Sequence, residues 1–219
     1  MINHYINLVV LGNFNPRILT HDFLARECGI KLGKKPLAEN NPIPVVSSLD
    51  YEKYVFFVDL GRIQITEKKC QNPEKSEIPN YLNIYLNKLK YTPITKCGAN
   101  FSYDVEVNEA KLNQIEKDIS KNRLIFNRVI RETGIILEVV FDIKNENEII
   151  QNWVLKTSKP TDQESTTLKV QRESSSKVKI DFNFEINLEK NRDQIEKITS
   201  NYNEVYRAFL SQLQTIFEV

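Results

Sequence analysis

The amino-acid sequence predicts an α+β protein built on antiparallel sheets, with a C-terminal four-stranded meander closed by a long amphipathic C-terminal helix. A strand pattern followed by a helix pattern supports this fold class. Apolar residues occupy alternate positions through residues 178–188, and charged or amide side chains occupy the positions between them. Because six apolar residues at a period of two would scatter around a helix, this segment is predicted to be a strand.

The segment that follows has helical periodicity. Apolar residues recur every three or four positions through residues 195–216, which is the spacing of a single helix face. A helix of this length needs an apolar surface to cover, and the inner face of the meander is the nearest one. Three further strand-length segments complete the predicted meander: 135–143, 149–156 and 166–171.

The N-terminal half is predicted to have the order βαββαβ. The first strand, 6–11, ends before Pro16 because proline fixes its own φ and restricts the residue before it. Thr20 is a suitable N-cap for a short helix that ends at Gly29. The other predicted elements are a hairpin of 54–59 and 62–68, a helix from Pro79 to Leu89, a strand at 101–107, a short helix at 112–119, and a loop at 31–44.

Length and composition are those of an ordinary globular chain. The 219 residues are predicted to form a single domain, 1–219, although a junction near Asn108 would divide them into 1–108 and 109–219. Thirty Lys and Arg residues against 29 Asp and Glu residues give a net charge of +1, so composition singles out neither nucleic acid nor a membrane surface.

The predicted location is the cytoplasm. No apolar run approaches the ~18 residues that a membrane span needs. Cys28, Cys70 and Cys97 are odd in number and have no close pair, which is typical of free thiols in a reducing compartment.

The sequence holds no recognisable catalytic, cofactor-binding or metal-binding pattern, so we predict that the chain is not an enzyme. Cys28 lies seven positions after His21 and could form a Cys–His couple, but a small core residue is the favoured interpretation. The spacing of the cysteines does not suit zinc, and no glycine-rich phosphate loop occurs. Asp181 and Glu185 are interpreted as part of the solvated face of a strand.

Two short segments are candidate partner-binding sites. Asn13, Phe14 and Asn15 follow the first predicted strand, and Gly98 and Asn100 precede a later one. In the structural interpretation, the asparagines cap a turn and the glycine marks a β-bulge. In the functional interpretation, Phe14 and the amides contact a partner at the edge of the domain.

Three segments resemble a known family. They are residues 9–16 (VVLGNFNP) with Phe23-Leu24 after them, residues 91–101 (YTPITKCGANF), and residues 180–183 (IDFN) before the terminal helix. Their order and spacing are similar to those of a sporadically distributed, uncharacterised bacterial family associated with mobile or defence-gene neighbourhoods. A related family often has arginine where Cys97 or Ala99 stands here. The resemblance implies an accessory or partner-binding protein and assigns no functional residues.

The leading functional prediction is therefore a non-catalytic, protein-binding accessory subunit of a bacterial defence or toxin–antitoxin-like system. Its partner would be another protein, encoded in the same operon, or a second copy of this chain. A holdase is one alternative, because SecB-type chaperones also place long helices after an antiparallel sheet. The other is a nucleic-acid-binding module, which would need exposed aromatic side chains beside cations. Its candidates are Lys31, Lys34, Lys35, Lys68 and Lys69 with Tyr51, Tyr54, Phe56 and Phe57.

Overall fold

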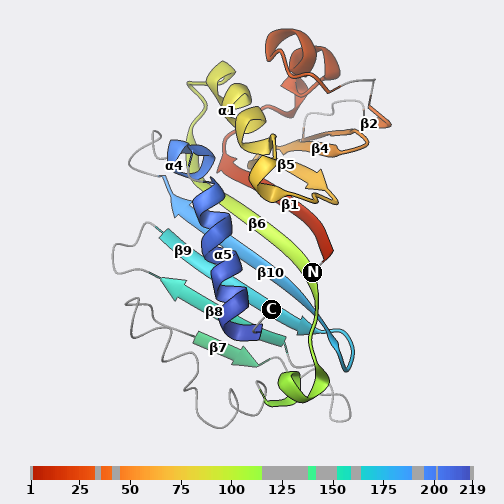
Figure 1. The fold of residues 1–219 in the computed structure, drawn as a ribbon. Helices are drawn as coiled ribbons and strands as arrows, with labels where there is room; N and C mark the ends of the chain where they lie inside the picture. Colours follow the sequence, from red (N-terminus) through yellow and green to blue (C-terminus); the bar gives the residue numbers. More distant parts are fainter. Residues whose placement is uncertain are drawn as a thin grey trace.

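The computed structural model describes residues 2–32, 36–40, 45–114, 138–141, 152–158, 164–188, 195–200 and 202–217. Within these ranges, ten strands form one antiparallel sheet with the order β2-β3-β4-β5-β1-β6-β10-β9-β8-β7 (Figure 1). The strands are β1 (Ile2–Gly12), β2 (Ala38–Asn40), β3 (Val46–Asp50), β4 (Tyr54–Asp59), β5 (Arg62–Lys68), β6 (Ile94–Glu106), β7 (Glu138–Phe141), β8 (Asn152–Ser158), β9 (Glu164–Arg172) and β10 (Lys177–Asn187).

The described helical elements are short, apart from two. The labelled ones are η1 (Pro16–Ile18), η2 (Phe23–Glu27), η3 (Pro73–Lys75), α1 (Ile78–Lys88), α4 (Ile195–Ser200) and α5 (Tyr202–Phe217). Residues 109–114 are also helical. Pro79 stands in the first turn of α1, where its missing N–H costs no hydrogen bond.

The predicted fold class is wrong. The sequence suggested a βαββαβ half and a separate four-stranded meander, whereas β6 pairs with β1 on one side and with β10 on the other. Both halves therefore belong to one continuous sheet. The prediction of a single long closing helix is also wrong, because α4 and α5 take its place. The assignment of residues 1–219 to a single domain stays a prediction.

Several local predictions also need correction. The segment expected to be an α-helix near Thr20 instead forms the π-helical turn η2, in which the Cys28 N–H donates to the Phe23 carbonyl at 3.0 Å. Strands β2 and β3 were not predicted, and β2 lies in the expected loop. Residues 115–119 of a predicted helix lie outside the described residues, as do 135–137, 142–143 and 149–151 of two predicted strands.

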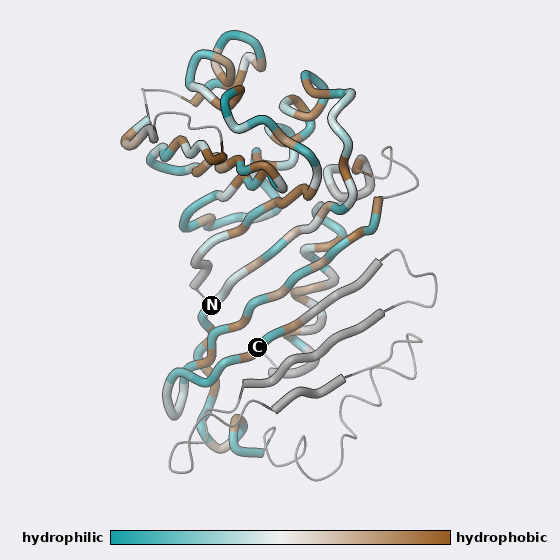
Figure 2. The backbone as a smooth tube through the Cα atoms, turned by 180° about the vertical axis from the view of Figure 1, so that it is seen from behind, coloured by the Kyte–Doolittle hydropathy of each residue, from teal (hydrophilic) through white to brown (hydrophobic). Residues whose placement is uncertain are grey.

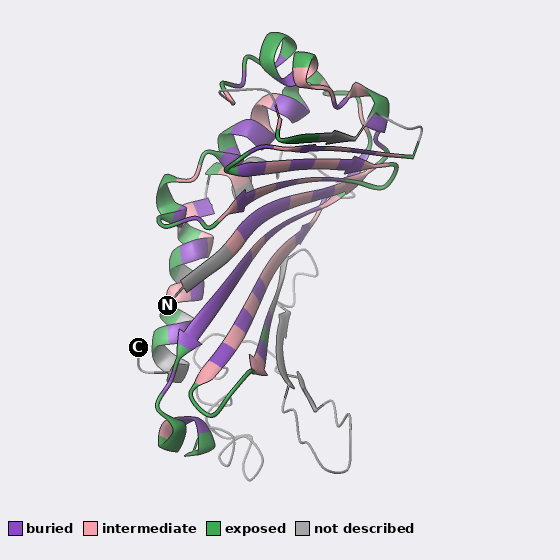
Figure 3. Ribbon diagram, turned by 90° about the vertical axis from the view of Figure 1, so that its right-hand side faces the viewer, coloured by how far each residue is buried: buried purple, intermediate pink, exposed green. Residues whose placement is uncertain are grey.

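One face of the sheet is covered. Helices α1, α4 and α5 lie on the same side of it (Figures 1 and 3). Alternation along the strands sends apolar side chains toward these helices, including Ile6, Leu8 and Val10 of β1. The ring of Phe209 on α5 stacks on Phe101 of β6 with 5.6 Å between ring centroids. This layer forms the hydrophobic core.

The opposite face is open. Figure 2 views it directly, and none of the described helices lies over β1, β6 or β10 on that side. Alternation places the polar residues of these strands there, including Asn7, Asn100 and Asn183. The open face is therefore the surface on which the polar strand positions meet.

Candidate functional site

A row of polar side chains crosses four strands of the open face. Strand register aligns Thr66 of β5 with Asn7 of β1, Asn7 with Asn100 of β6, and Asn100 with Asn183 of β10. The Asn100 Nδ2 donates a hydrogen bond to the Asn7 Oδ1 at 2.7 Å. Cross-strand neighbours on one face lie about 4.5–5.5 Å apart at Cβ, so these side chains form one contiguous surface.

Neighbouring rows extend this surface. Ser102 of β6 lies opposite Asp181 of β10, and its Oγ donates to the Asp181 Oδ1 at 2.6 Å. On β5, the Gln64 Nε2 donates to the Thr66 Oγ1 at 3.0 Å. A hollow of about 540 Å³ lies on this surface. Its lining consists of Asn7, Gln64, Thr66, Asn100, Asp181 and Asn183 together with Arg62, Lys169, Tyr5, Val9, Phe101 and Phe182.

A side chain at Gly98 would have little room, because β6 and β10 run close together there. A Cβ at this position would lie 3.0 Å from the Phe184 carbonyl oxygen and 3.5 Å from the Asn183 Oδ1. The expected β-bulge is absent at this point, since the register of β6 with both neighbours is continuous through Gly98 and Asn100.

Some polar groups of the open face are buried although no described helix covers them. Asn7, Ser102 and Asp104 are all less than a tenth exposed. Buried polar groups need hydrogen-bonding partners, and each of these side chains has one on the sheet itself. The Asp104 Oδ2 lies 2.5 Å from the Lys177 Nζ. The open face is thus a preorganised set of amides, hydroxyls and carboxylates.

Charges at the margins of the open face are paired. Lys96 binds Glu185 at 2.9 Å at one end, and Lys177 binds both Asp104 and Glu173 at the other. The margins of the face therefore carry ion pairs, and Arg62 and Lys169 line the hollow between them.

The five predicted partner-binding residues fall into two groups. Gly98 and Asn100 belong to the open face, opposite Val9 and Asn7. Asn13 and Asn15 are exposed beyond the end of β1, where the Asn15 Oδ1 accepts from the Arg17 N–H at 3.1 Å and caps η1.

Phe14 is buried in the hydrophobic core, so its side chain is not presented to a partner. Partner binding by the other four residues stays a prediction.

Sequence reasoning missed Asn7, Gln64, Thr66 and Ser102. All four lie on strands that the sequence did predict. Gln64, Thr66 and Ser102 also occupy the polar positions of a period-two pattern. The missing information was register, because only strand pairing shows which polar positions become neighbours.

Three of the four aromatic candidates for nucleic-acid stacking lie in the core, and the fourth, Phe57, is on the open face opposite Gln64. Tyr51, Tyr54 and Phe56 are buried, and the half-buried Phe57 lies beneath the Arg62 guanidinium at 4.8 Å. Of the first basic cluster, Lys34 and Lys35 lie outside the described residues. The structure therefore does not assemble the predicted stacking platform from the three buried rings.

Cys28 is a core residue, which is the interpretation that the sequence favoured over a Cys–His couple. The His21 Nδ1 lies 2.9 Å from the Tyr51 hydroxyl, and Cys28 is buried in the core. Burial raises the pKa of Cys28 to about 11, and it raises the pKa values of Cys70 and Cys97 to about 12.

These pKa values predict poor thiol reactivity in the folded protein. Only the thiolate attacks a disulfide reagent, and a pKa of about 11 leaves on the order of one thiol in a thousand ionised at pH 8. We expect Cys28, Cys70 and Cys97 to react slowly with a chromogenic disulfide at pH 8, faster as pH rises, and at once in denaturant. Rapid reaction of any of the three in the native protein would contradict the described packing.

A second polar cluster lies on the covered face. The carboxylate of Glu67 is buried there, accepts from the Ser76 Oγ at 2.5 Å, and lies 3.1 Å from the Lys53 Nζ. The nearby hydroxyl of Tyr202 is buried without a hydrogen-bond partner within the described part of the chain. Because Glu67 and Tyr202 are both buried, we assign these two residues to the core.

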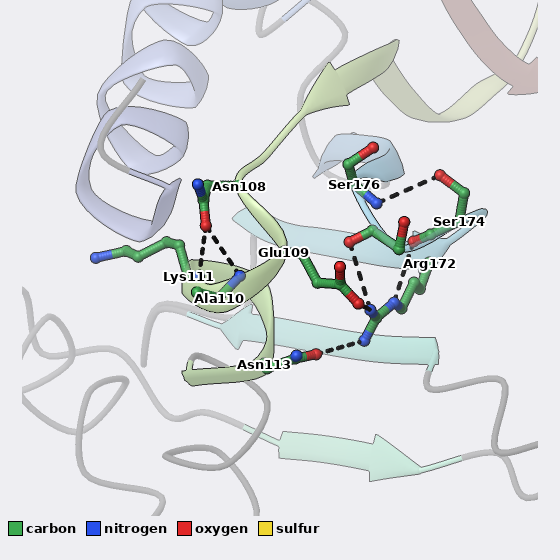
Figure 4. A network of polar contacts seen from close by, with 9 residues as sticks. Asn108, Glu109, Ala110, Lys111, Asn113, Arg172, Ser174 and Ser176 are labelled. Carbon is green, nitrogen blue, oxygen red and sulfur yellow. Dashed lines mark hydrogen bonds and ion pairs between the residues drawn. The ribbon is translucent and has the colours of Figure 1, made fainter.

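Arg172 joins two segments at the far end of the sheet (Figure 4). Its Nη1 donates to the Asn113 Oδ1 at 3.0 Å, and its Nε donates to the Ser174 carbonyl at 3.1 Å. The contact fixes the chain that follows β6 against the β9–β10 turn. Because these donors are already used, the network is structural.

The described ranges contain no group of three or more His, Cys, Asp or Glu side chains placed to hold a metal ion. Across the same ranges, every helix is too short or too polar to cross a membrane.

No protein-family model and no curated protein sequence matches the chain. Among solved structures, a rolling circle replication initiator protein from Geobacillus stearothermophilus is similar over 84% of this chain and 73% of its own, with 11% sequence identity and a TM-score of 0.30. The family resemblance seen in the sequence stays a prediction.

Proposed function

We propose that this chain is a non-catalytic binding subunit and that a partner protein docks on the open face of its sheet. The observation that carries the proposal is the cross-strand set of amide and hydroxyl side chains, held in place by their own hydrogen bonds and surrounding a hollow. Polar groups that are already positioned lose little side-chain entropy when a partner binds.

A protein suits this face better than a nucleic acid does. Binding to a phosphate backbone depends on cations that displace counterions. On the open face, Lys96, Lys177 and Arg62 are paired with carboxylates of the same sheet, and Lys169 lies opposite Asp181 in the strand register. A protein surface offers the mixture of donors, acceptors and opposite charges that complements such a face.

The holdase alternative is less well supported. A holdase needs an exposed apolar surface for its clients. Here the apolar side chains of β1, β6 and β10 pack beneath α1, α4 and α5. The open face that remains combines polar side chains with a few half-buried apolar ones such as Tyr5 and Val9.

A bacterial defence or toxin–antitoxin-like system, with the partner encoded in the same operon, is part of the proposal. So is a cytoplasmic location, which the three buried free thiols support because a reducing compartment preserves them.

The substitution Asn100→Arg tests the docking face. It removes the bond to Asn7 and places a long cation in the middle of the hollow, so we expect affinity for the operon-encoded neighbour to fall about thirtyfold or more, as at an interface hot spot. Titration calorimetry with the purified neighbour measures the loss.

Asn87→Arg is the matched control, because Asn87 is exposed on α1 away from the open face. Circular dichroism checks that both variants fold. Unchanged affinity in a folded Asn100→Arg variant would contradict the proposal.

A further inference from the structure

Three loops meet just beyond the C-terminal end of β1. We call residues 12–18, 59–62 and 88–96 the loop junction. Backbone hydrogen bonds tie the loops together: the Gly12 N–H donates to the Gly61 carbonyl at 2.9 Å, the Asn13 N–H to Pro93 at 2.9 Å, and the Phe14 N–H to Leu60 at 3.1 Å. The loop junction is thus a cross-linked unit that presents its side chains from a fixed backbone.

The loop junction exposes two large apolar side chains. Among the described residues, the exposed large apolar side chains are Leu37, Val45, Leu60 and Tyr91. Leu60 is 52% exposed and Tyr91 is 87% exposed, and both belong to the loop junction. Tyrosine is enriched at protein interfaces because its ring supplies contact area at a low cost in conformational entropy.

The loop junction is also basic. Its three segments contain Arg17, Arg62, Lys88, Lys90 and Lys96 against a single acidic residue, Asp59, so its formal net charge is +4 (5 − 1) while the whole chain carries +1. Arg62 is paired with Asp59 and Lys96 with Glu185, and the exposed Arg17, Lys88 and Lys90 carry the remaining charge. The Lys90 ammonium lies 5.1 Å from the centre of the Tyr91 ring. Apolar and cationic groups therefore stand side by side, which suits a partner segment that combines apolar and acidic residues.

The loop junction continues into the open face. Leu11, the last residue before the junction, lies opposite Arg62 on one side and Lys96 on the other. Lys96 pairs with Glu185 on the open face itself. One partner could therefore contact both surfaces without a gap between them.

We propose that the loop junction anchors an acidic segment of the partner protein, with Leu60 and Tyr91 contacting its apolar residues and the surrounding cations contacting its carboxylates. The inference rests on the proposed function, since it names the chemistry of the partner. It also explains why Asn13 and Asn15, which are exposed in the junction, lie apart from Asn100.

A pool of short synthetic peptides made of Asp, Glu, Leu and Phe is the probe. Fluorescence anisotropy should show binding to the wild-type chain that weakens as salt rises, and at least tenfold weaker binding to the double variant Leu60→Ser/Tyr91→Ser. Leu37→Ser is the matched control, because Leu37 is 73% exposed outside the loop junction. It should bind as the wild type does.

Three results would overturn the inference. They are no binding of the pool to the wild-type chain, equal binding to the double variant, or equal binding of a pool in which serine replaces Leu and Phe. Tighter binding of a thymidine oligonucleotide of the same length would do so as well, because it would assign the cations to phosphate. The result is separable from the docking-face test: if the peptides fail while Asn100→Arg still abolishes binding of the neighbour, only the loop junction proposal falls.

Discussion

Replacing Phe209 by alanine should destabilise the protein by about 3–5 kcal/mol, the usual cost of removing a fully buried phenylalanine. Phe209 is completely buried where α5 crosses the sheet. Its ring centroid lies 4.9 Å from that of Phe182 and 5.6 Å from that of Phe101, so its loss would leave a cavity between the helix and two central strands. Urea unfolding followed by circular dichroism measures the change.

Phe209→Leu is the control, because it keeps most of the apolar volume and should cost less than half as much. A loss below about 1 kcal/mol for Phe209→Ala would mean that the site collapses or that α5 does not pack on β6 and β10. A loss of amide protection in α5 alone, without global destabilisation, would also indicate that α5 does not pack on β6 and β10.

Replacing Gly12 by alanine should also cost several kilocalories, on the order of 2–3 kcal/mol, although it adds only one methyl group. A Cβ at Gly12 would lie 2.4 Å from the Pro93 carbonyl oxygen and 3.1 Å from the Ile94 Cα. Both are backbone atoms, so relief requires β1 and β6 to separate where their register already shifts, between Leu11 and Gly12. The expected result is a lower urea midpoint with an unchanged m-value.

Gly61→Ala is a matched control in the same loop junction. A Cβ there would meet only the Asp59 Oδ1, at 3.5 Å, which is an ordinary contact. We therefore expect its effect to stay within about 0.5 kcal/mol. Equal stability of the two variants would contradict the described approach of β1 and β6.

Local patterns predicted many of the elements. Alternation identified β10, the hairpin of β4 and β5 was placed at its observed bounds, and Pro79 marked the start of α1. These signals are strong because each depends on residues within one turn or one strand. The short strand β2 gave no such signal, since three residues cannot show a period.

Long-range pairing could not be predicted in the same way. Apolar alternation on β6 shows which residues face the core, but it is the same whether β6 is an edge strand or a central one. The structure places Cys97 between Val10 and Ile186, which merges the two predicted units into one sheet. The break between α4 and α5 was hidden because the apolar stripe continues through both helices.

The candidate site was predicted only in part. Gly98 and Asn100 were chosen for their position before a strand, and strand alternation places both on the open face, where Asn7 and Asn183 flank Asn100. Asn7 lies within a predicted strand but was not singled out, because its importance appears only when its hydrogen bond to Asn100 is seen. Sites built across strands depend on register, which a single sequence does not display.

Lysine acetylation of the complex, read by mass spectrometry, tests the central claim most directly. Lys169 and Lys179 stand on β9 and β10 on the open side, whereas Lys75 is exposed on η3 beside the covered face. If the partner docks on the open face, binding will protect Lys169 and Lys179 and leave Lys75 as reactive as in the free protein. Protection of Lys75 with unchanged labelling of Lys169 and Lys179 would place the partner on the helices and contradict the account.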